Sequence, residues 1–167
     1  MHTDLRPATD RVRQTIFNVL QTRLSLIDAN ILDMFAGTGS LGLEALSRGA
    51  GHVTFVDSSF NAVDLIEANI KKLGCTEFCS VVRSDALRFM EGAQTSFDLI
   101  FADPPYRYEE TASIPGKIFS MQLLKKSGFL IIEHSKACVF QETEAYTLTT
   151  QRTLGQTVVS FFTELSQ

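Results

Sequence analysis

The chain has 167 residues, of which 44% are hydrophobic and 20% are charged, and its formal net charge at pH 7 is −4. This length suits a single domain, and the composition is that of a globular protein and excludes a disordered one. No apolar run approaches the roughly 20 residues that cross a bilayer, and the acidic balance excludes nucleic-acid binding through bulk positive charge, so such a partner needs a local patch.

The start of the chain predicts a helix followed by a strand. After Pro7, the pair Thr9 and Asp10 can cap a helix. Its apolar residues recur four apart, at Val12, Ile16, Leu20 and Leu24. The short apolar run ILDMF at 31–35 then predicts a strand, and AGTGSLG is the turn after it.

Helices and strands alternate through the middle of the chain. A helix through LGLEALSRG ends at Gly49, and HVTFVD at 52–57 predicts a second buried strand. Residues 61–73 predict a helix closed by Gly74. Its apolar face is formed by Val63, Ile66, Ile70 and Leu73. SVVRSD at 80–85 predicts a third strand with a short helix after it.

The last third contains two more buried strands and a hairpin. FDLIFAD (97–103) and FLIIEH (129–134) predict the fourth and fifth strands, with a helix around 115–126 between them. Residues 146–153 and 156–163 are rich in β-formers and predict an antiparallel hairpin at the sheet edge.

The alternation predicts an α/β fold of Rossmann-like architecture. We expect a mostly parallel seven-stranded sheet with an antiparallel C-terminal hairpin and helices on both faces. The whole chain, 1–167, is interpreted as one domain, with a helical segment at 1–28 and the Rossmann-like core at 29–167.

Acidic residues lie at four predicted strand ends. Asp33 lies within the first strand, and Asp57, Asp85 and Asp103 follow the second, third and fourth. Ligands of open α/β sheets bind beyond the carboxyl ends of the strands. A lined crevice is therefore expected there, although single acids could also cap the following helices.

The segment GTGSLG is a G-x-G-x-x-G sequence, and Asp57 lies 20 residues after Gly37. This pattern fits several nucleotide-like cofactors, because glycines let the backbone approach the ligand and an acid can bind ribose hydroxyls. It does not by itself separate NAD from S-adenosylmethionine. Asp33 favours the latter, since a carboxylate is unfavourable beside a pyrophosphate and favourable beside an ammonium group. Asp85 and Ala86 are then placed to meet the adenine edge.

The segment DPPY at 103–106 either ends a strand or presents acceptors to a ligand. Proline fixes its own φ and restrains the residue before it, so the turn is rigid. The Asp103 carboxylate and the Pro104 carbonyl could accept both N–H groups of an exocyclic base amine, and Tyr106 could stack on the base. Beside the glycine loop in the same sheet, the ligand interpretation is preferred.

Five segments together resemble one family. LRPATDRVRQTIFNVL, LDMFAGTGSLGLEALSRGA, FDLIFADPPYR, IIEH and RTLGQTVVSFF are similar, in this order, to bacterial enzymes that methylate a guanine N2 in small-subunit (16S) ribosomal RNA. The resemblance implies an S-adenosylmethionine-dependent methyltransferase of the guanine-966 type. It also implies a fold shared with other methyltransferases that use this cofactor.

The resemblance assigns roles to residues of this chain. The cofactor would be held by Asp33, Phe35, Ala36, Gly37, Thr38, Gly39, Asp57, Ser58, Asp85 and Ala86. The guanine amine would be bound by Asp103, Pro104, Pro105 and Tyr106. The helix through TDRVR would close over the cofactor or contact RNA, and Arg11, Arg13 and Arg107 are candidate RNA contacts that could equally face solvent.

The chain departs from the family in three places. Family members have a basic, strand-forming stretch before the LRP segment, which is a candidate RNA contact, whereas this sequence begins four residues before Leu5. Asp57 stands where glutamate is common, and Leu154 where an aromatic residue is common. We interpret His134 as settling the end of the fifth strand and not as a catalytic residue.

We therefore expect a cytoplasmic, monomeric RNA methyltransferase that acts on 16S rRNA within a small subunit or an assembly intermediate, with no metal and no membrane partner. Cys75, Cys79 and Cys138 are odd in number, include no C-x-x-C pair and are interpreted as reduced thiols. Three alternatives stay open: an adenine-N6 methyltransferase of DNA or RNA, a NAD(P)-dependent oxidoreductase, and an rRNA-binding assembly factor with little turnover.

Overall fold

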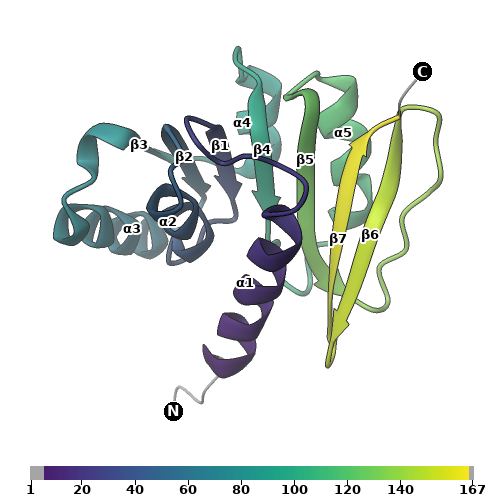
Figure 1. The fold of residues 1–167 in the computed structure, drawn as a ribbon, viewed down its shortest axis with the longest axis horizontal. Helices are drawn as coiled ribbons and strands as arrows, with labels where there is room; N and C mark the ends of the chain where they lie inside the picture. The colour runs from purple at the N-terminus through teal and green to yellow at the C-terminus, as the bar shows by residue number, and fades with distance from the viewer. Residues whose placement is uncertain (1–5, 166–167) are drawn as a thin grey trace.

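The computed structural model describes residues 6–165. Within this range seven strands form one sheet in the order β3-β2-β1-β4-β5-β7-β6 (Figure 1). The strands are β1 Asn30–Met34, β2 His52–Asp57, β3 Cys79–Arg83, β4 Phe97–Ala102, β5 Leu124–Ser135, β6 Tyr146–Leu154 and β7 Thr157–Glu164. The α-helices are α1 Arg6–Leu20, α2 Ser40–Ser47, α3 Phe60–Leu73, α4 Ala86–Gly92 and α5 Ile114–Ser120, with 3₁₀ turns η1 Thr76–Phe78 and η2 Thr111–Ser113.

The first five strands are parallel, and β7 and β6 are antiparallel to their neighbours. From β1 the chain builds the sheet in one direction through β2 and β3, and then in the other direction through β4 and β5. The order therefore reverses between β1 and β4, which is where open α/β sheets bind ligands. The prediction of a mostly parallel seven-stranded sheet with a C-terminal hairpin is confirmed.

Two apolar clusters cover the two faces of the sheet. Helices α1, α2 and α3 pack on one face, where Phe17 of α1 and Ile66 of α3 are fully buried with Phe55 of β2. Helices α4 and α5 pack on the other face, where Met90 and Ile118 meet the side chains of the central strands (Figure 1). No helix within residues 6–165 combines the length and the apolar character that crossing a bilayer requires.

Helix α1 differs from the sequence prediction at both ends. It begins at Arg6, so Thr9 and Asp10 lie inside it and do not cap it. Proline is tolerated in the first turn of a helix, where its missing N–H has no partner to lose, so Pro7 does not delay the start. The helix ends at Leu20, and Leu24 packs against the core from the following loop. Residues 1–5 and 166–167, the ends of the predicted domain, lie outside the described residues.

Two further predictions were wrong in detail. Leu73 is 64% exposed because it lies in the last turn of α3, beside the left-handed cap Gly74. The helix expected around 115–126 is only α5, and β5 already begins at Leu124. The strand continues through Gly128, where a Cβ would lie 2.8 Å from the carbonyl oxygen of Asp98, so only glycine fits without a shift.

Candidate functional site

A cavity of about 240 Å³ opens at the carboxyl ends of β1, β4 and β5, where the strand order reverses. Its walls come from α1, from the loop between β1 and α2, and from the residues that end β4 and β5. The lining residues are Val12, Arg13, Asp33, Phe35, Ala36, Gly37, Thr38, Ser40, Leu41, Asp103 and Glu133. The structure thus brings together the predicted glycine loop and the predicted D-P-P-Y turn.

The three glycines of GTGSLG have distinct local tasks. Gly37 and Gly39 have φ values of 58° and 79°, a region that side chains disfavour. A Cβ on Gly42 would lie 2.5 Å from Cε1 of Phe55, so this glycine lets α2 pack closely on β2. Phe35 is also left-handed, with φ of 54°, although it carries a side chain. The loop is held in a shape that few other sequences could adopt.

Asp33 is a buried carboxyl group at the base of this cavity. Its side chain is 2% exposed, and its Oδ2 accepts a hydrogen bond of 3.0 Å from the backbone N–H of Gly42. Burial raises the pKa of Asp33 well above its ordinary value, against the opposing effect of that hydrogen bond, and the charges of Asp103 and Asp57 raise it further. Within residues 10–165 it forms no ion pair. The group is therefore suited to a cationic ligand.

Asp57 and Asp85 hold the loops that follow their strands. Asp57 accepts from the N–H of Gly37 through Oδ2 at 3.0 Å and from the N–H of Ser59 through Oδ1 at 2.9 Å. Asp85 caps α4, since its Oδ2 accepts from the N–H of Arg88 at 3.2 Å. The capping role considered for Asp85 is thus present, and its carboxylate retains acceptor capacity for a ligand.

Asp103 faces a second carboxyl group that the sequence analysis did not single out. Asp103 follows β4, and Glu133 lies near the end of the adjacent strand β5. Asp103 is exposed to solvent, and it also lines the glycine-loop cavity together with Glu133. Burial, together with a hydrogen bond to Glu133 and its charge, raises the pKa of Asp103 to about 9. The sequence carried a signal for Glu133, because this acid lies near the end of the predicted fifth strand, as the other four acids do on theirs.

The rest of the D-P-P-Y turn lines a different cavity, of about 310 Å³. Pro104 is buried, whereas the ring of Tyr106 is 83% exposed. The N–H of Tyr108 donates to the carbonyl oxygen of Pro105 at 2.9 Å, which closes the turn. Asp103 belongs to the glycine-loop cavity and Pro104 to Tyr106 belong to the second one, so the turn separates two spaces.

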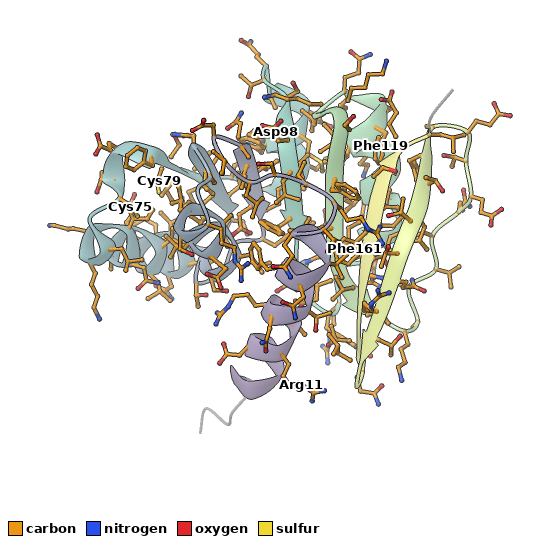
Figure 2. The ribbon with its side chains drawn as sticks, in the orientation of Figure 1. Arg11, Cys75, Cys79, Asp98, Phe119 and Phe161 are labelled. Carbon is orange, nitrogen blue, oxygen red and sulfur yellow. The ribbon has the colours of Figure 1, made fainter. Side chains whose placement is uncertain are left out.

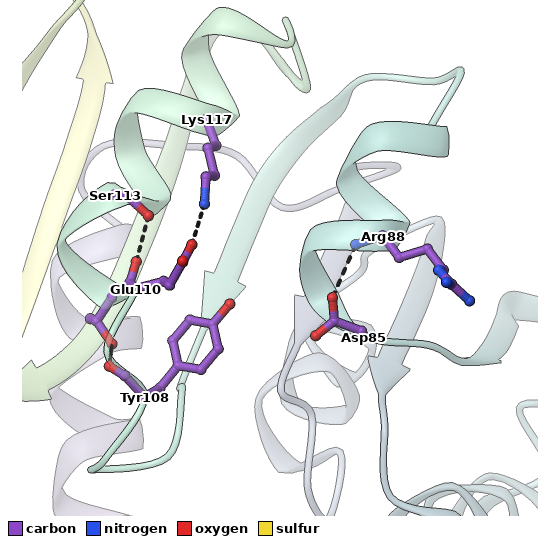
Figure 3. A network of polar contacts seen from close by, with 7 residues as sticks. Asp85, Arg88, Tyr108, Glu110, Ser113 and Lys117 are labelled. Atoms are coloured by element: carbon purple, nitrogen blue, oxygen red, sulfur yellow. Dashed lines mark hydrogen bonds and ion pairs between the residues drawn. The ribbon is translucent and has the colours of Figure 1, made fainter.

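Tyr108 is another residue that the sequence analysis missed. Its ring packs edge-on against Phe35, with ring centroids 5.1 Å apart. Figure 3 shows the ring extending from the loop after β4 toward the side on which Asp85 begins α4. Burial raises the pKa of Tyr108, and the charges of Asp85 and Glu110 raise it further. The loop after β4 thus reaches the region that the sequence assigns to adenine, a placement that only the fold reveals.

The remaining predicted residues lie around these cavities. Ser58 is exposed between β2 and α3, and Ala86 is buried at the start of α4. Arg13 lines the glycine-loop cavity and pairs with Asp10 at 2.9 Å. Arg11 lies near the outer end of α1, away from the sheet (Figure 2), and it is exposed. Arg107 is exposed directly after the turn.

His134 has a structural role at the end of β5, as predicted. Its Nε2 lies 2.7 Å from Oγ of Ser160, and its Nδ1 lies 2.8 Å from the carbonyl oxygen of Ser135. Burial lowers the pKa of His134, and its ring packs edge-on against Phe140. Both ring nitrogens are therefore engaged within the protein.

The geometry agrees with comparisons to known proteins. The family model described as "Conserved hypothetical protein 95" matches residues 1–163. Ribosomal RNA small subunit methyltransferase D of Haemophilus influenzae is 33% identical over 160 residues, which cover 94% of this chain and 81% of that protein. The protein of the same name from Escherichia coli is 38% identical over 143 residues, covering 84% and 65%. A solved structure of a conserved hypothetical protein from Streptococcus pyogenes superposes with a TM-score of 0.83 at 25% identity, covering 92% of this chain and 95% of that one.

Proposed function

The chain belongs to the family described as conserved hypothetical protein 95, and from this premise we propose that it transfers a methyl group from S-adenosylmethionine to the N2 amine of a guanine in 16S rRNA. Its relatives named ribosomal RNA small subunit methyltransferase D support rRNA methylation. The observation that carries the proposal is the D-P-P-Y turn between two cavities, because methyl transfer requires a donor and an acceptor that meet at one wall.

The glycine-loop cavity fits S-adenosylmethionine by the chemistry of its donors and acceptors. The buried Asp33 carboxyl group would bind the ammonium of the methionine part, and the left-handed Gly37 and Gly39 let the backbone approach a ligand. Asp57 and Asp85 would accept from the ribose hydroxyls and the adenine amine. When bound, this cofactor supplies a methyl group on a positively charged sulfur, which makes the methyl carbon electrophilic.

The D-P-P-Y turn would bind and orient the guanine. An exocyclic amine is a weak nucleophile because its lone pair is delocalised into the ring. Acceptors on its two N–H groups, the Asp103 carboxylate and the Pro104 carbonyl, would hold the nitrogen in line with the methyl carbon. The base must leave its stack to reach this wall, as in other enzymes that act on a base.

The proposed partner is folded 16S rRNA within a small subunit or an assembly intermediate. The net charge of −4 gives little general affinity for RNA. Arg13 lines the glycine-loop cavity, and Arg107 follows the turn, so both lie where a phosphate near the target base would pass. Binding to naked RNA is then weak and strongly dependent on salt. Because its substrate would be the ribosomal subunit, the enzyme would act in the cytoplasm. We propose that it acts there as a monomer.

The decisive test is methyl transfer from labelled S-adenosylmethionine to unmodified small subunits and to their naked RNA, followed by digestion to nucleosides. We expect label in N2-methylguanosine and, after mapping, at guanine 966. Label in N6-methyladenosine would keep the methyltransferase and overturn the base. No transfer to any RNA, combined with binding of NADH in direct titration, would favour the oxidoreductase alternative.

We expect Tyr106→Ala to weaken substrate use without affecting the fold. The ring is 83% exposed, so its removal leaves no cavity in the core. Stacking of a base on an aromatic ring contributes about 1–3 kcal/mol, so kcat/KM for the RNA should fall about 5- to 150-fold, mainly through KM. Thermal melting and methyl transfer at varied RNA concentration measure the two effects, and Tyr106→Phe should retain activity. An unchanged kcat/KM in Tyr106→Ala would remove the ring from the base pocket.

A further inference from the structure

Glu133 has no role in the chemistry proposed above, although it lines the same cavity as Asp33 and Asp103. We propose that Glu133 is a positioning residue for the methyl transfer: its carboxyl group shares one proton with that of Asp103, and this hydrogen bond holds the Asp103 side chain toward the cavity. The inference rests on the proposed function and adds a residue to it.

The sheet register places the two carboxyl groups together. Strands β4 and β5 are parallel, and Ala102 of β4 pairs with Ile132 of β5. The acid is the next residue in each case, so Asp103, directly after β4, and Glu133, within β5, lie at the same level of neighbouring strands. Both side chains line the glycine-loop cavity, and a hydrogen bond to Glu133 is among the causes that raise the pKa of Asp103. Since an ionised carboxylate has no proton to donate, one of the two must be protonated for this bond to form.

The charges around the pair favour retention of that proton. Asp33 on β1 is buried and lines the same cavity, and a carboxyl group can add no positive charge there. Among the described residues of the cavity wall, Arg13 of α1 is the sole cation, and it already pairs with Asp10. Asp57 on β2 holds its own loop through two backbone N–H groups. A second negative charge in the pair would therefore meet little compensation.

The strand on the other side of β5, β7, adds no charge to the pair. Glu133 pairs across the sheet with the apolar Val159 of β7. His134 is the next residue on β5, and its Nε2 and Nδ1 are engaged by Ser160 and Ser135. Burial lowers the pKa of this histidine, so it is neutral at the pH of the assay.

The consequence is a dependence of the reaction on pH. While the proton is shared, the Asp103 side chain is held beside Glu133 and its remaining oxygen can accept from the guanine amine. When the proton is lost, two adjacent carboxylates repel each other. Asp103 reaches solvent in part, so it can turn away from the cavity. The pKa of Asp103, raised to about 9, sets the range in which this change occurs.

The experiment compares Glu133→Gln and Glu133→Leu with the wild type in methyl transfer to small subunits between pH 7 and 10. The glutamine amide donates to Asp103 at every pH, so at pH 7.5 its kcat should lie within about threefold of wild type. Above pH 8 the kcat of the wild type should decline as the shared proton is lost, and the kcat of Glu133→Gln should not. Its kcat relative to wild type should rise about tenfold from pH 8 to pH 10, as expected for loss of a proton at pH 9. Titration of the guanine itself affects both proteins equally and cancels in this ratio.

Glu133→Leu removes the donor altogether. Its kcat should fall about 10²-fold, the cost of a misplaced catalytic group, with the KM for S-adenosylmethionine within about twofold of wild type. A constant ratio of Glu133→Gln to wild type across the pH range, or a full kcat in Glu133→Leu, would overturn the inference.

A second readout requires no turnover. In ¹³C NMR of the carboxyl groups, the wild type should show a titration step of Asp103 near pH 9, and Glu133→Gln should lack that step. Completion of the Asp103 titration below pH 6 would overturn the shared proton. A wild-type protein that shows the shared step yet methylates no RNA would overturn the proposed function instead, so the two failures are distinguishable.

Discussion

Asp103→Asn is expected to reduce methyl transfer about 10²- to 10³-fold and to raise the melting temperature of the protein at pH 8. The loss of rate follows because the amide is a weaker hydrogen-bond acceptor than a carboxyl group that shares one negative charge with Glu133, so the positive charge that develops on the guanine amine is less well balanced. Removal of one preorganised electrostatic group at a reacting centre has this cost in other enzymes. Methyl transfer under single-turnover conditions measures the rate, and thermal melting from pH 4.5 to 9 measures the stability.

The gain in stability follows from the direction of the pKa shift. The pKa of Asp103 is about 9 in the folded protein and 3.8 ordinarily. The folded state therefore holds a proton that the unfolded state releases, and wild-type stability is full below pH 4 and declines as the pH rises toward 9. Asparagine cannot ionise, so the difference between variant and wild type should be small at pH 4.5 and largest near pH 9.

Asp64→Asn is the matched control, since Asp64 lies exposed on α3. It should change neither the rate of methyl transfer nor the melting temperature at pH 8, because it removes an exposed side chain far from the reacting groups. Asp103→Asn with half the wild-type rate would show that this carboxylate takes no part in the reaction. If Asp103→Asn melts below the wild type at pH 8, folding does not raise the pKa of Asp103.

The elements with a strong period or a glycine signal were predictable. The alternation of apolar strands and helices was sufficient to predict the sheet, and Gly74 closes α3 in the left-handed conformation that the sequence suggests. The glycine loop and the D-P-P-Y turn were located because few other structures need those residues at that spacing. The predicted bounds of two helices were wrong. Helix α1 begins earlier than predicted because Pro7 fits inside its first turn. Helix α5 ends earlier because β5 begins at Leu124, where it pairs with β4.

The parts of the site that the sequence did not reveal depend on strand order. Glu133 lies 30 residues after Asp103, and only the pairing of β4 with β5 brings the two carboxyl groups together. The contact of Tyr108 with Phe35 depends in the same way on β1 and β4 being neighbours. A single sequence contains the residue types, but the register that makes them neighbours comes from the fold.

Asp33→Asn is expected to weaken the binding of S-adenosylhomocysteine about 10²-fold while the protein stays folded. Asparagine keeps an acceptor for the N–H of Gly42, which bonds to Oδ2 of Asp33 at 3.0 Å. It removes the charge that would meet the ligand's ammonium group, and loss of one partner of a buried charge pair costs about 2–5 kcal/mol. Isothermal titration calorimetry measures the affinity. 5′-Methylthioadenosine, which lacks the ammonium group, is the matched ligand and should bind both proteins equally.

The raised pKa of Asp33 adds a sharper test, because it ties ligand binding to proton release. In the free protein, burial favours the protonated carboxyl group, whereas a bound ammonium group favours the ionised one. Binding to the wild type should therefore release a proton and tighten as the pH rises from 5, until the pH exceeds the raised pKa. In Asp33→Asn both effects should vanish, which calorimetry in buffers of different ionisation enthalpy resolves. Equal proton release by the two proteins would mean that Asp33 does not bind the ammonium group, and the proposed orientation of the cofactor would have to be reversed.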